Sequence, residues 1–104
     1  MVEIKMNDLS KYIADWREKK GFSTPSKLSE NHDVLAKLML VVSEIGEAAE
    51  AVRHQDQKNF EEEIADTIIR LLDLTGTMGI DIESALRKKM AINEKREYMH
   101  GKYS

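Results

Sequence analysis

Two pairs of acidic side chains, each spaced three residues apart, are the feature of this 104-residue chain best suited to chemistry. Glu44 and Glu47 form the first pair, and Glu63 and Asp66 form the second. Residues three apart on a helix project side by side, so two antiparallel helices would bring four carboxylates together. Four carboxylates repel one another in a poorly solvated cleft, and a hard divalent cation such as Mg²⁺ removes that cost. The spacing therefore predicts a magnesium site.

The competing interpretation is that these acids only solvate a helix surface, where pairs three apart are common. Two observations favour a site. Each pair lies in a narrow polar stripe on an otherwise apolar helix, and acidic residues concentrate in this part of the chain. Positions 44–66 hold eight acidic residues against two basic ones.

The opposite charge lies near the C-terminal end, where positions 87–104 hold six basic residues against two acidic ones. Lys89, Asn93 and Arg96 continue the helix face on which the apolar residues at 82, 85 and 86 lie. Opposite an acidic metal site, these side chains can hold phosphate oxygens, lysine as a point charge and arginine as a bidentate donor. A basic last turn that complements the helix dipole is the alternative. It does not explain why Lys89 and Arg96 follow the core face.

Helices must position these residues, and the sequence predicts four of them. Apolar periodicity indicates helices over about residues 5–19, 31–54, 59–77 and 82–99. The candidate N-caps are Asn7 or Asp8, Asn31 or Asp33, Asn59, and Asp81. Gly79 suits the left-handed residue that ends a helix. No segment alternates with period two, so we predict an all-α fold of the four-helix-bundle type, one domain over residues 1–104.

The two middle helices are apolar over most of their surface. One face of the second helix carries Leu35, Leu38, Met39, Val42, Gly46 and Ala49. One face of the third carries Ile64, Ile68, Leu71 and Thr75. Helices that are apolar nearly all round are buried ones, and a chain of this size has too little protein to cover them. We therefore expect a helical homo-oligomer.

Composition excludes several classes of protein. A net charge of −3 argues against a general nucleic-acid binder. The chain has no cysteine, so it has neither disulfides nor thiolate metal sites. Its longest apolar run, residues 38–42, is far short of the roughly 20 residues that span a bilayer, and no signal-peptide pattern is present. We expect a cytoplasmic protein that binds neither membranes nor nucleic acid. A phosphate-loop motif and a nucleophile elbow are also absent.

The acidic motifs resemble those of the MazG-like all-α nucleoside triphosphate pyrophosphohydrolases. That family's signature is Glu-x-x-Glu, a spacer of variable length, and Glu-x-x-Asp. Here it reads Glu44-Ile-Gly-Glu47, fifteen intervening residues, and Glu63-Ile-Ala-Asp66. Many members carry a doubled glutamate at the start of the first motif, whereas this chain has Ser43 before Glu44.

The family's later Lys-x-x-x-Asn-x-x-Arg run is matched by Lys89, Asn93 and Arg96. The resemblance covers about residues 35–102. It implies a MazG-like helical fold, assembly as a homo-dimer or homo-tetramer, and hydrolysis of a (d)NTP between the α and β phosphates. The products would be a (d)NMP and pyrophosphate, with Mg²⁺ or Mn²⁺ as cofactor, in nucleotide-pool cleaning.

The resemblance also implies roles for individual residues. Glu44, Glu47, Glu63 and Asp66 would be metal ligands. Of the catalytic pair Glu44 and Glu47, we favour Glu47 as the group that takes the proton of the attacking water.

Substrate binding would fall to the basic helix. Lys89, Asn93 and Arg96 would hold the phosphates or the sugar and stabilise the developing charge. Lys37 and Arg70 are the second-choice groups, either for binding phosphate or for supporting the metal ligands.

A second hypothesis belongs to a different class. The chain could be a non-catalytic helical oligomer that acts as a metal- or nucleotide-binding or interaction module, and Ser43 in place of the doubled glutamate motivates it.

Overall fold

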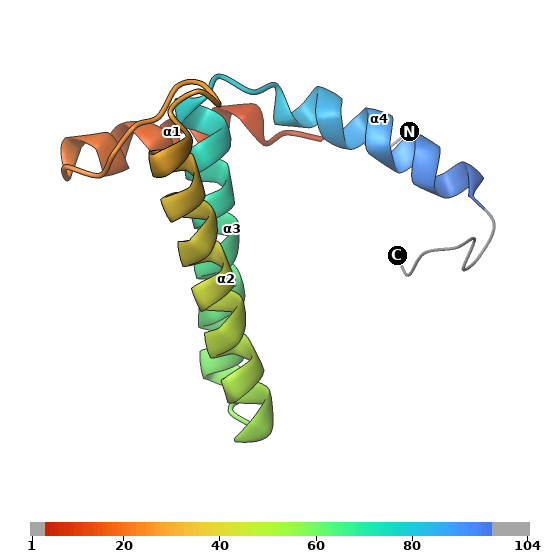
Figure 1. Cartoon of the computed structure of the whole chain (residues 1–104). Coiled ribbons are helices and arrows are strands. Elements are labelled where there is room, and N and C mark those ends of the chain that lie inside the picture. Colours follow the sequence, from red (N-terminus) through yellow and green to blue (C-terminus); the bar gives the residue numbers. More distant parts are fainter. Residues whose placement is uncertain (1–3, 97–104) are drawn as a thin grey trace.

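The computed structural model describes residues 4–96, and this part of the chain consists of four α-helices without a strand. The helices are α1 (Asn7–Lys19), α2 (Asn31–Arg53), α3 (Gln57–Thr77) and α4 (Ile82–Lys95). Helices α2 and α3 form a long antiparallel hairpin, α1 crosses one end of it, and α4 extends away from that end (Figure 1). The all-α prediction is confirmed. Within one chain, however, α4 does not complete a bundle with the other three helices.

The predicted helix starts differ from the observed ones in how they are capped. Helix α1 follows Met6 and α2 follows Glu30, and neither N-terminus has a side-chain cap from its own first turn. The predicted caps Asn7 or Asp8 and Asn31 or Asp33 are therefore wrong. All four residues lie within the first turn of their helix, because α1 begins at Asn7 and α2 at Asn31.

Asp56 caps α3 by accepting a hydrogen bond from the backbone N–H of Asn59 at 3.1 Å. The predicted cap Asn59 is thus the residue that donates, and α3 begins two residues earlier than expected. Asp81 caps α4 as predicted, accepting from the Ser84 N–H at 3.0 Å. Gly79 has the predicted left-handed conformation, with φ at 64°. Helix α4 ends at Lys95, and the rest of its predicted span, residues 97–99, lies outside the described residues.

The polar stripe of α3 faces α2 within the hairpin. Helix α2 buries one line of side chains at Val34, Lys37, Val41, Ala48 and Ala51. Helix α3 meets this line with charged residues, because Arg70 pairs with Glu44 and Asp73 pairs with Lys37. The narrow polar stripe predicted on α3 is therefore the part that faces α2.

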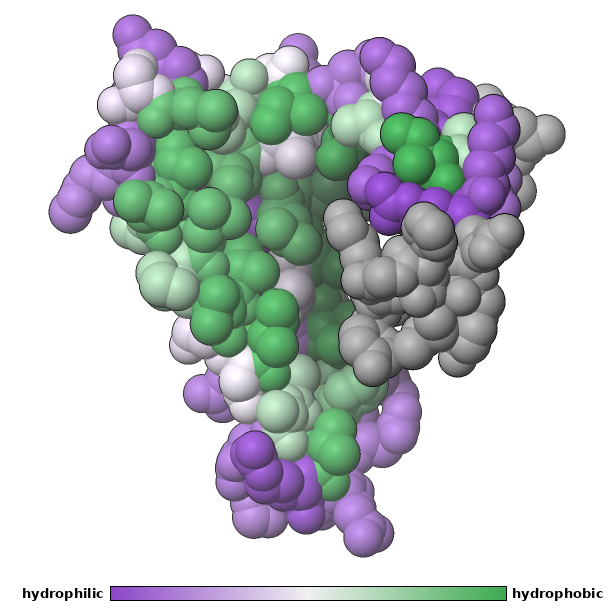
Figure 2. All heavy atoms as spheres, turned by 45° about the vertical axis from the view of Figure 1, so that its right-hand side comes forward, coloured by the Kyte–Doolittle hydropathy of each residue, from purple (hydrophilic) through white to green (hydrophobic). Residues whose placement is uncertain are grey.

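The apolar faces of the same two helices consequently point outward. Leu35, Met39, Val42 and Ile45 on α2 are each more than half exposed, and Ile64, Ile68 and Leu71 on α3 are also exposed. Figure 2 shows hydrophobic side chains over much of the visible face of the hairpin, whereas the surface of α4, at the upper right, is mostly hydrophilic. None of the described helices is long and apolar enough to cross a membrane.

Helix α1 packs closely on the end of α3. The Ser10 hydroxyl donates to the Leu72 carbonyl oxygen at 2.6 Å and lies 2.7 Å from the Thr75 hydroxyl. A Cβ at Gly76 would lie 2.5 Å from the Ser10 carbonyl oxygen and 2.7 Å from the Ala14 Cβ. Glycine at position 76 therefore permits the close approach that holds α1 on the hairpin.

This contact gives a testable prediction. Gly76→Ala should lower the free energy of unfolding by about 1–3 kcal/mol, because the added methyl group must displace backbone. Lys11→Ala is the control: this position of α1 is exposed and lies away from the apolar faces of α2 and α3, so alanine should change stability by less than about 0.5 kcal/mol. Urea or thermal unfolding measures both. Equal effects of the two substitutions would contradict the tight contact.

Candidate metal and phosphate site

Three of the four predicted metal ligands converge between α2 and α3. Glu44, Glu63 and Asp66 each offer a carboxylate oxygen, and these three oxygens lie within 4.8 Å of one another. Glu44 comes from α2, whereas Glu63 and Asp66 lie three residues apart on α3. An all-oxygen, all-carboxylate donor set suits a hard cation such as Mg²⁺ or Mn²⁺. The residues present therefore fit a divalent metal.

Glu47, the fourth predicted ligand, lies outside this three-carboxylate set. Its side chain is exposed, one helical turn beyond Glu44 on α2. It still belongs to the same neighbourhood, because its charge is one of those that raise the pKa of Glu63. The geometry thus separates Glu47 from the three acids that meet.

The electrostatics of the cluster disfavour the ionised form of Glu63. Partial desolvation raises the pKa of Glu63 above its ordinary value, and the charges of Glu44, Asp66 and Glu47 raise it further. Ionised Glu63 is therefore less favourable in the folded chain than in the unfolded one. This penalty is present above the raised pKa and disappears as pH falls below the ordinary value. A bound cation reverses the effect by favouring the ionised form.

Arg70 supplies positive charge from the protein itself. Its Nε lies 3.4 Å from a Glu44 carboxylate oxygen, with both side chains partly shielded from solvent. The residue stands one helical turn after Asp66 on α3, which places its guanidinium beside the acidic cluster. The contact with Glu44 is the kind expected of a group that supports the metal ligands, and phosphate binding by Arg70 stays a prediction.

Lys37 has a different partner from the one expected. Its ammonium donates to an Asp73 carboxylate oxygen at 2.8 Å, and both residues are buried. The Arg17 Nε lies 3.1 Å from the same oxygen without hydrogen-bond geometry, and its guanidinium stacks 4.0 Å from the centroid of the Phe22 ring. Asp73 thus joins α1, α2 and α3, and Lys37 serves this network. A phosphate-binding role for Lys37 finds no support in this geometry.

Sequence reasoning did not single out Asp73 or Arg17 as members of a charge network. The available signal was periodicity, since Asp73 follows Asp66 by seven residues and so occupies the same helix face. No pattern in the sequence identified Arg17 as its partner from another helix.

The remaining predicted substrate-binding residues lie on or at the end of α4. Lys89 and Asn93 are exposed on this helix, and Arg96 is its C-terminal cap in an extended conformation. Because α4 extends away from the hairpin, the structure of one chain does not bring them to the acidic cluster (Figure 1). Their role stays a prediction.

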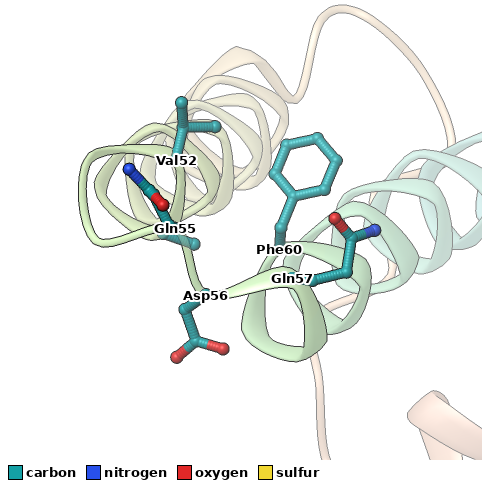
Figure 3. A pocket seen from close by; sticks show the side chains of 6 residues that line it. Val52, Gln55, Asp56, Gln57 and Phe60 are labelled. Carbon is teal, nitrogen blue, oxygen red and sulfur yellow. The ribbon is translucent and has the colours of Figure 1, made fainter.

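Two other features near the hairpin differ from this site. Glu50 is held by Arg53 at 2.8 Å and by His54 at 2.9 Å, contacts that lower its pKa. A pocket of about 290 Å³ at the tip of the hairpin is lined by Val52, Phe60 and polar residues of the turn, and the Asp56 carboxylate points away from Phe60 (Figure 3). Neither feature gathers several carboxylates as the α2–α3 cluster does.

Comparison with known protein families gives a match that covers α2, α3 and α4. Residues 32–99 match the model of the MazG nucleotide pyrophosphohydrolase domain. The chain therefore belongs to the MazG family, as the motifs predicted.

One relative is named dATP/dGTP diphosphohydrolase, from Cyanophage S-2L. It is 39% identical over 64 residues, which are 62% of this chain and 54% of the relative. The chain thus matches about half the length of that protein. No solved structure matches the chain significantly.

The acidic cluster predicts a stabilising effect of divalent cations. Mg²⁺ or Mn²⁺ in excess over its dissociation constant should raise the melting temperature by several degrees, because a ligand that binds only the folded state stabilises it. Glu63→Gln should lose most of this shift. Glu50→Gln should keep it, because Glu50 is paired with Arg53 and His54 rather than with the cluster. Calorimetry or thermal-shift assays measure the effect, and an unchanged shift in Glu63→Gln would exclude that residue as a ligand.

Proposed function

We propose that this protein is a Mg²⁺-dependent nucleoside triphosphate pyrophosphohydrolase, which cleaves between the α and β phosphates to give a nucleoside monophosphate and pyrophosphate. The observation that carries the proposal is the convergence of Glu44, Glu63 and Asp66 from two helices. Membership of the MazG nucleotide pyrophosphohydrolase domain family supports it independently.

The three converging carboxylates would hold the metal, with Mn²⁺ as an alternative to Mg²⁺. When bound there, a divalent cation would neutralise phosphate charge and help to activate the attacking water. Arg70, beside the cluster, is placed to attract phosphate oxygens once Glu44 is engaged by the cation.

Glu47 is the residue that we assign to proton transfer. Its exposed carboxylate lies next to the acidic cluster without belonging to the three-oxygen set. A general base needs contact with the attacking water and a free carboxylate oxygen to accept the proton. The exposed carboxylate of Glu47 leaves an oxygen to accept the proton, whereas the carboxylate of Glu44 converges with two others and pairs with Arg70, which supports Glu47 as the base.

The substrate class is a nucleoside triphosphate, and we include purine deoxynucleotides because the phage relative is named for dATP and dGTP. Removal of unwanted nucleotides from the pool is the biological role that we propose. We place the enzyme in the cytoplasm, where such nucleotides are made and used. We expect neither nucleic acid nor membrane as a partner.

Product analysis tests this function. Purified protein with Mg²⁺ and a panel of canonical and modified triphosphates should release monophosphate and pyrophosphate. Glu47→Gln should lower kcat by about 10²–10⁴-fold with helicity unchanged, because the general base is lost. Asp66→Asn should reduce turnover to background by weakening metal binding.

The alternatives give different results in the same assay. Release of orthophosphate and a diphosphate would contradict α–β cleavage. Binding of nucleotide and Mg²⁺ without product after long incubation would favour the non-catalytic binding module. Glu50→Gln serves as the active control, since its side chain lies outside the cluster and pairs with Arg53 and His54.

We also propose that the working unit is a homo-dimer or homo-tetramer formed through the outward apolar faces of α2 and α3. The exposed hydrophobic residues there form one continuous surface, rather than scattered single side chains (Figure 2). Continuous apolar surfaces of this kind mark sites of protein association.

A charge placed on this surface should break the oligomer. Met39 and Val42 are 59% and 55% exposed in the single chain. Met39→Asp with Val42→Asp should convert the oligomer to a smaller species in light scattering, because the buried carboxylates would repel across the interface. The matched control carries aspartate at Lys11, an exposed position on α1. An unchanged mass of the double variant would place the interface elsewhere.

A further inference from the structure

Asp73 is the most deeply buried charged side chain among the described residues, with 2% of its surface exposed. One of its carboxylate oxygens lies 2.8 Å from the Lys37 Nζ and 3.1 Å from the Arg17 Nε. Both cationic residues are buried as well. We call these three residues, which come from α3, α2 and α1, the Asp73 network (Asp73, Lys37 and Arg17). None of them belongs to the three-carboxylate cluster.

Arg17 is held on the same side of α3 as Asp73. Its Nε is buried and makes no hydrogen bond, and the Asp73 carboxylate supplies the opposite charge beside it. The Arg17 guanidinium stacks 4.0 Å from the centroid of the Phe22 ring, which shields it from water. Helix α1, which carries Arg17, is fixed on α3 by the hydrogen bond from Ser10 to the Leu72 carbonyl oxygen. The cation therefore cannot follow if α3 turns about its own axis.

The Asp73 network restricts how α2 and α3 can turn about their own axes. If either helix turned its buried line outward, the network members on the other helices would stay buried without their partner. A buried charge that loses its partner is strongly destabilising, whereas a complete buried ion pair adds little net stability. The network therefore selects one rotation of the helices among the compact arrangements open to them.

The apolar faces of the hairpin favour a different rotation. Met39 and Ile45 on α2 are 59% and 54% exposed in the single chain, and Ile68 on α3 is 47% exposed. These faces form much of the surface visible in Figure 2. Turning both helices would place the apolar faces against each other and remove them from water, which the hydrophobic effect favours. Within one chain, the inward position of the acids therefore needs an interaction that opposes this rotation.

The Asp73 network and the acidic cluster are equally spaced on the two helices. Lys37 precedes Glu44 by seven residues on α2, and Asp73 follows Asp66 by seven residues on α3. Seven residues are nearly two full turns, about 10 Å along the axis, so the two members of each pair share a helix face. Because the helices are antiparallel (Figure 1), the rotation that joins Lys37 to Asp73 also brings Glu44 to Asp66.

We propose that the Asp73 network positions the metal ligands, because it fixes the rotation of α2 and α3 and so brings Glu44 against Glu63 and Asp66. The importance of this role for catalysis rests on the proposed function. The three members of the network act through the acidic cluster, two helical turns away, and touch neither metal nor substrate. They are positioning residues.

Mn²⁺ binding to the nucleotide-free protein, followed by the electron paramagnetic resonance signal of the free ion, tests this role. Lys37→Met should weaken Mn²⁺ binding by about tenfold or more, as for other groups that orient metal ligands. Lys37→Arg keeps a positive charge beside Asp73 and should retain most of the affinity. Both are measured well below the melting temperature of each variant.

The direction of the change distinguishes positioning from the charge of Lys37 itself. Removing a cation about 10 Å from the cluster would by charge alone tighten Mn²⁺ binding. No nucleotide is present, so a loss of affinity cannot come from a phosphate contact. Unchanged or tighter Mn²⁺ binding by Lys37→Met would overturn the proposal.

A variant with an apolar network separates positioning from stability. Asp73→Leu, Lys37→Met and Arg17→Met together leave no network charge unpaired, and replacements of this kind are often neutral or stabilising. This apolar variant should keep its helicity and a melting temperature close to that of the wild type, yet bind Mn²⁺ at least about tenfold more weakly. Wild-type affinity in the folded apolar variant would overturn the proposal. If the apolar variant does not fold, Lys37→Met and Lys37→Arg decide the question.

Cross-linking without metal tests the helix rotation directly. The chain has no cysteine, so Glu44→Cys with Asp66→Cys gives a single pair of thiols across α2 and α3. A bifunctional bimane reagent, fluorescent once both thiols of one chain have reacted, should link this pair readily when the network is intact. The apolar variant should link it several-fold more slowly. The matched control, Glu63→Cys with Asp66→Cys, has both thiols on one helix and should link equally with either network.

The two readouts distinguish this proposal from the proposed function. Equal linking of the Glu44→Cys and Asp66→Cys pair with and without the charged network would overturn the positioning role. A wild-type protein that binds no Mn²⁺ and releases no pyrophosphate would contradict the proposed function. Slower linking in the apolar variant would still support the control of helix rotation by the Asp73 network.

Discussion

Charged side chains between α2 and α3 are the constraint on which the rest of this structure depends. A buried charge is costly unless it is paired, and two places along the hairpin differ in how their charges are matched. Near α1, one carboxylate, Asp73, has two cationic partners, Lys37 and Arg17. Two helical turns away, three partly exposed carboxylates meet, and Arg70 pairs with one of them, Glu44. The first place is neutralised by the protein's own charges, whereas the second has more carboxylates than cationic partners among the described residues.

The outward apolar surface follows from the same constraint. A helix that turns its polar stripe toward its neighbour must turn its apolar residues away from it. Leu35, Met39 and Val42 are therefore exposed in the single chain, while the contact between the helices uses small residues such as Ala48 and Ala51. The hairpin turns charged side chains toward the contact between α2 and α3 and leaves many of its largest hydrophobic side chains exposed, and such apolar surfaces are typical of sites of protein association.

Helical periodicity was sufficient to predict the four helices and the convergence of two acidic motifs, because both depend on residues close in sequence. Helical periodicity did not predict contacts between residues that are far apart in the sequence. The start of α1 is capped by Glu83, more than seventy positions later, so Asn7 and Asp8 were natural but wrong choices. Lys37 looked like a free cation because Asp73 is far from it in sequence. The direction of α4 depends on the hydrogen bonds that Glu83, in its first turn, accepts from the backbone N–H groups of Met6 and Asn7, and no local pattern encodes them.

The structure of the hairpin also explains the effect of the serine that precedes the first acidic motif. Ser43 is exposed and stands about 100° around α2 from Glu44. Glu44 points between the helices, where it meets Glu63 and Asp66. The side chain of a glutamate at position 43 would project from the outer surface of α2. The three-carboxylate cluster therefore does not depend on it. The departure from the doubled glutamate therefore removes no member of the cluster. The serine would instead affect contacts on the outer side of α2, where substrate or a second copy would meet the hairpin.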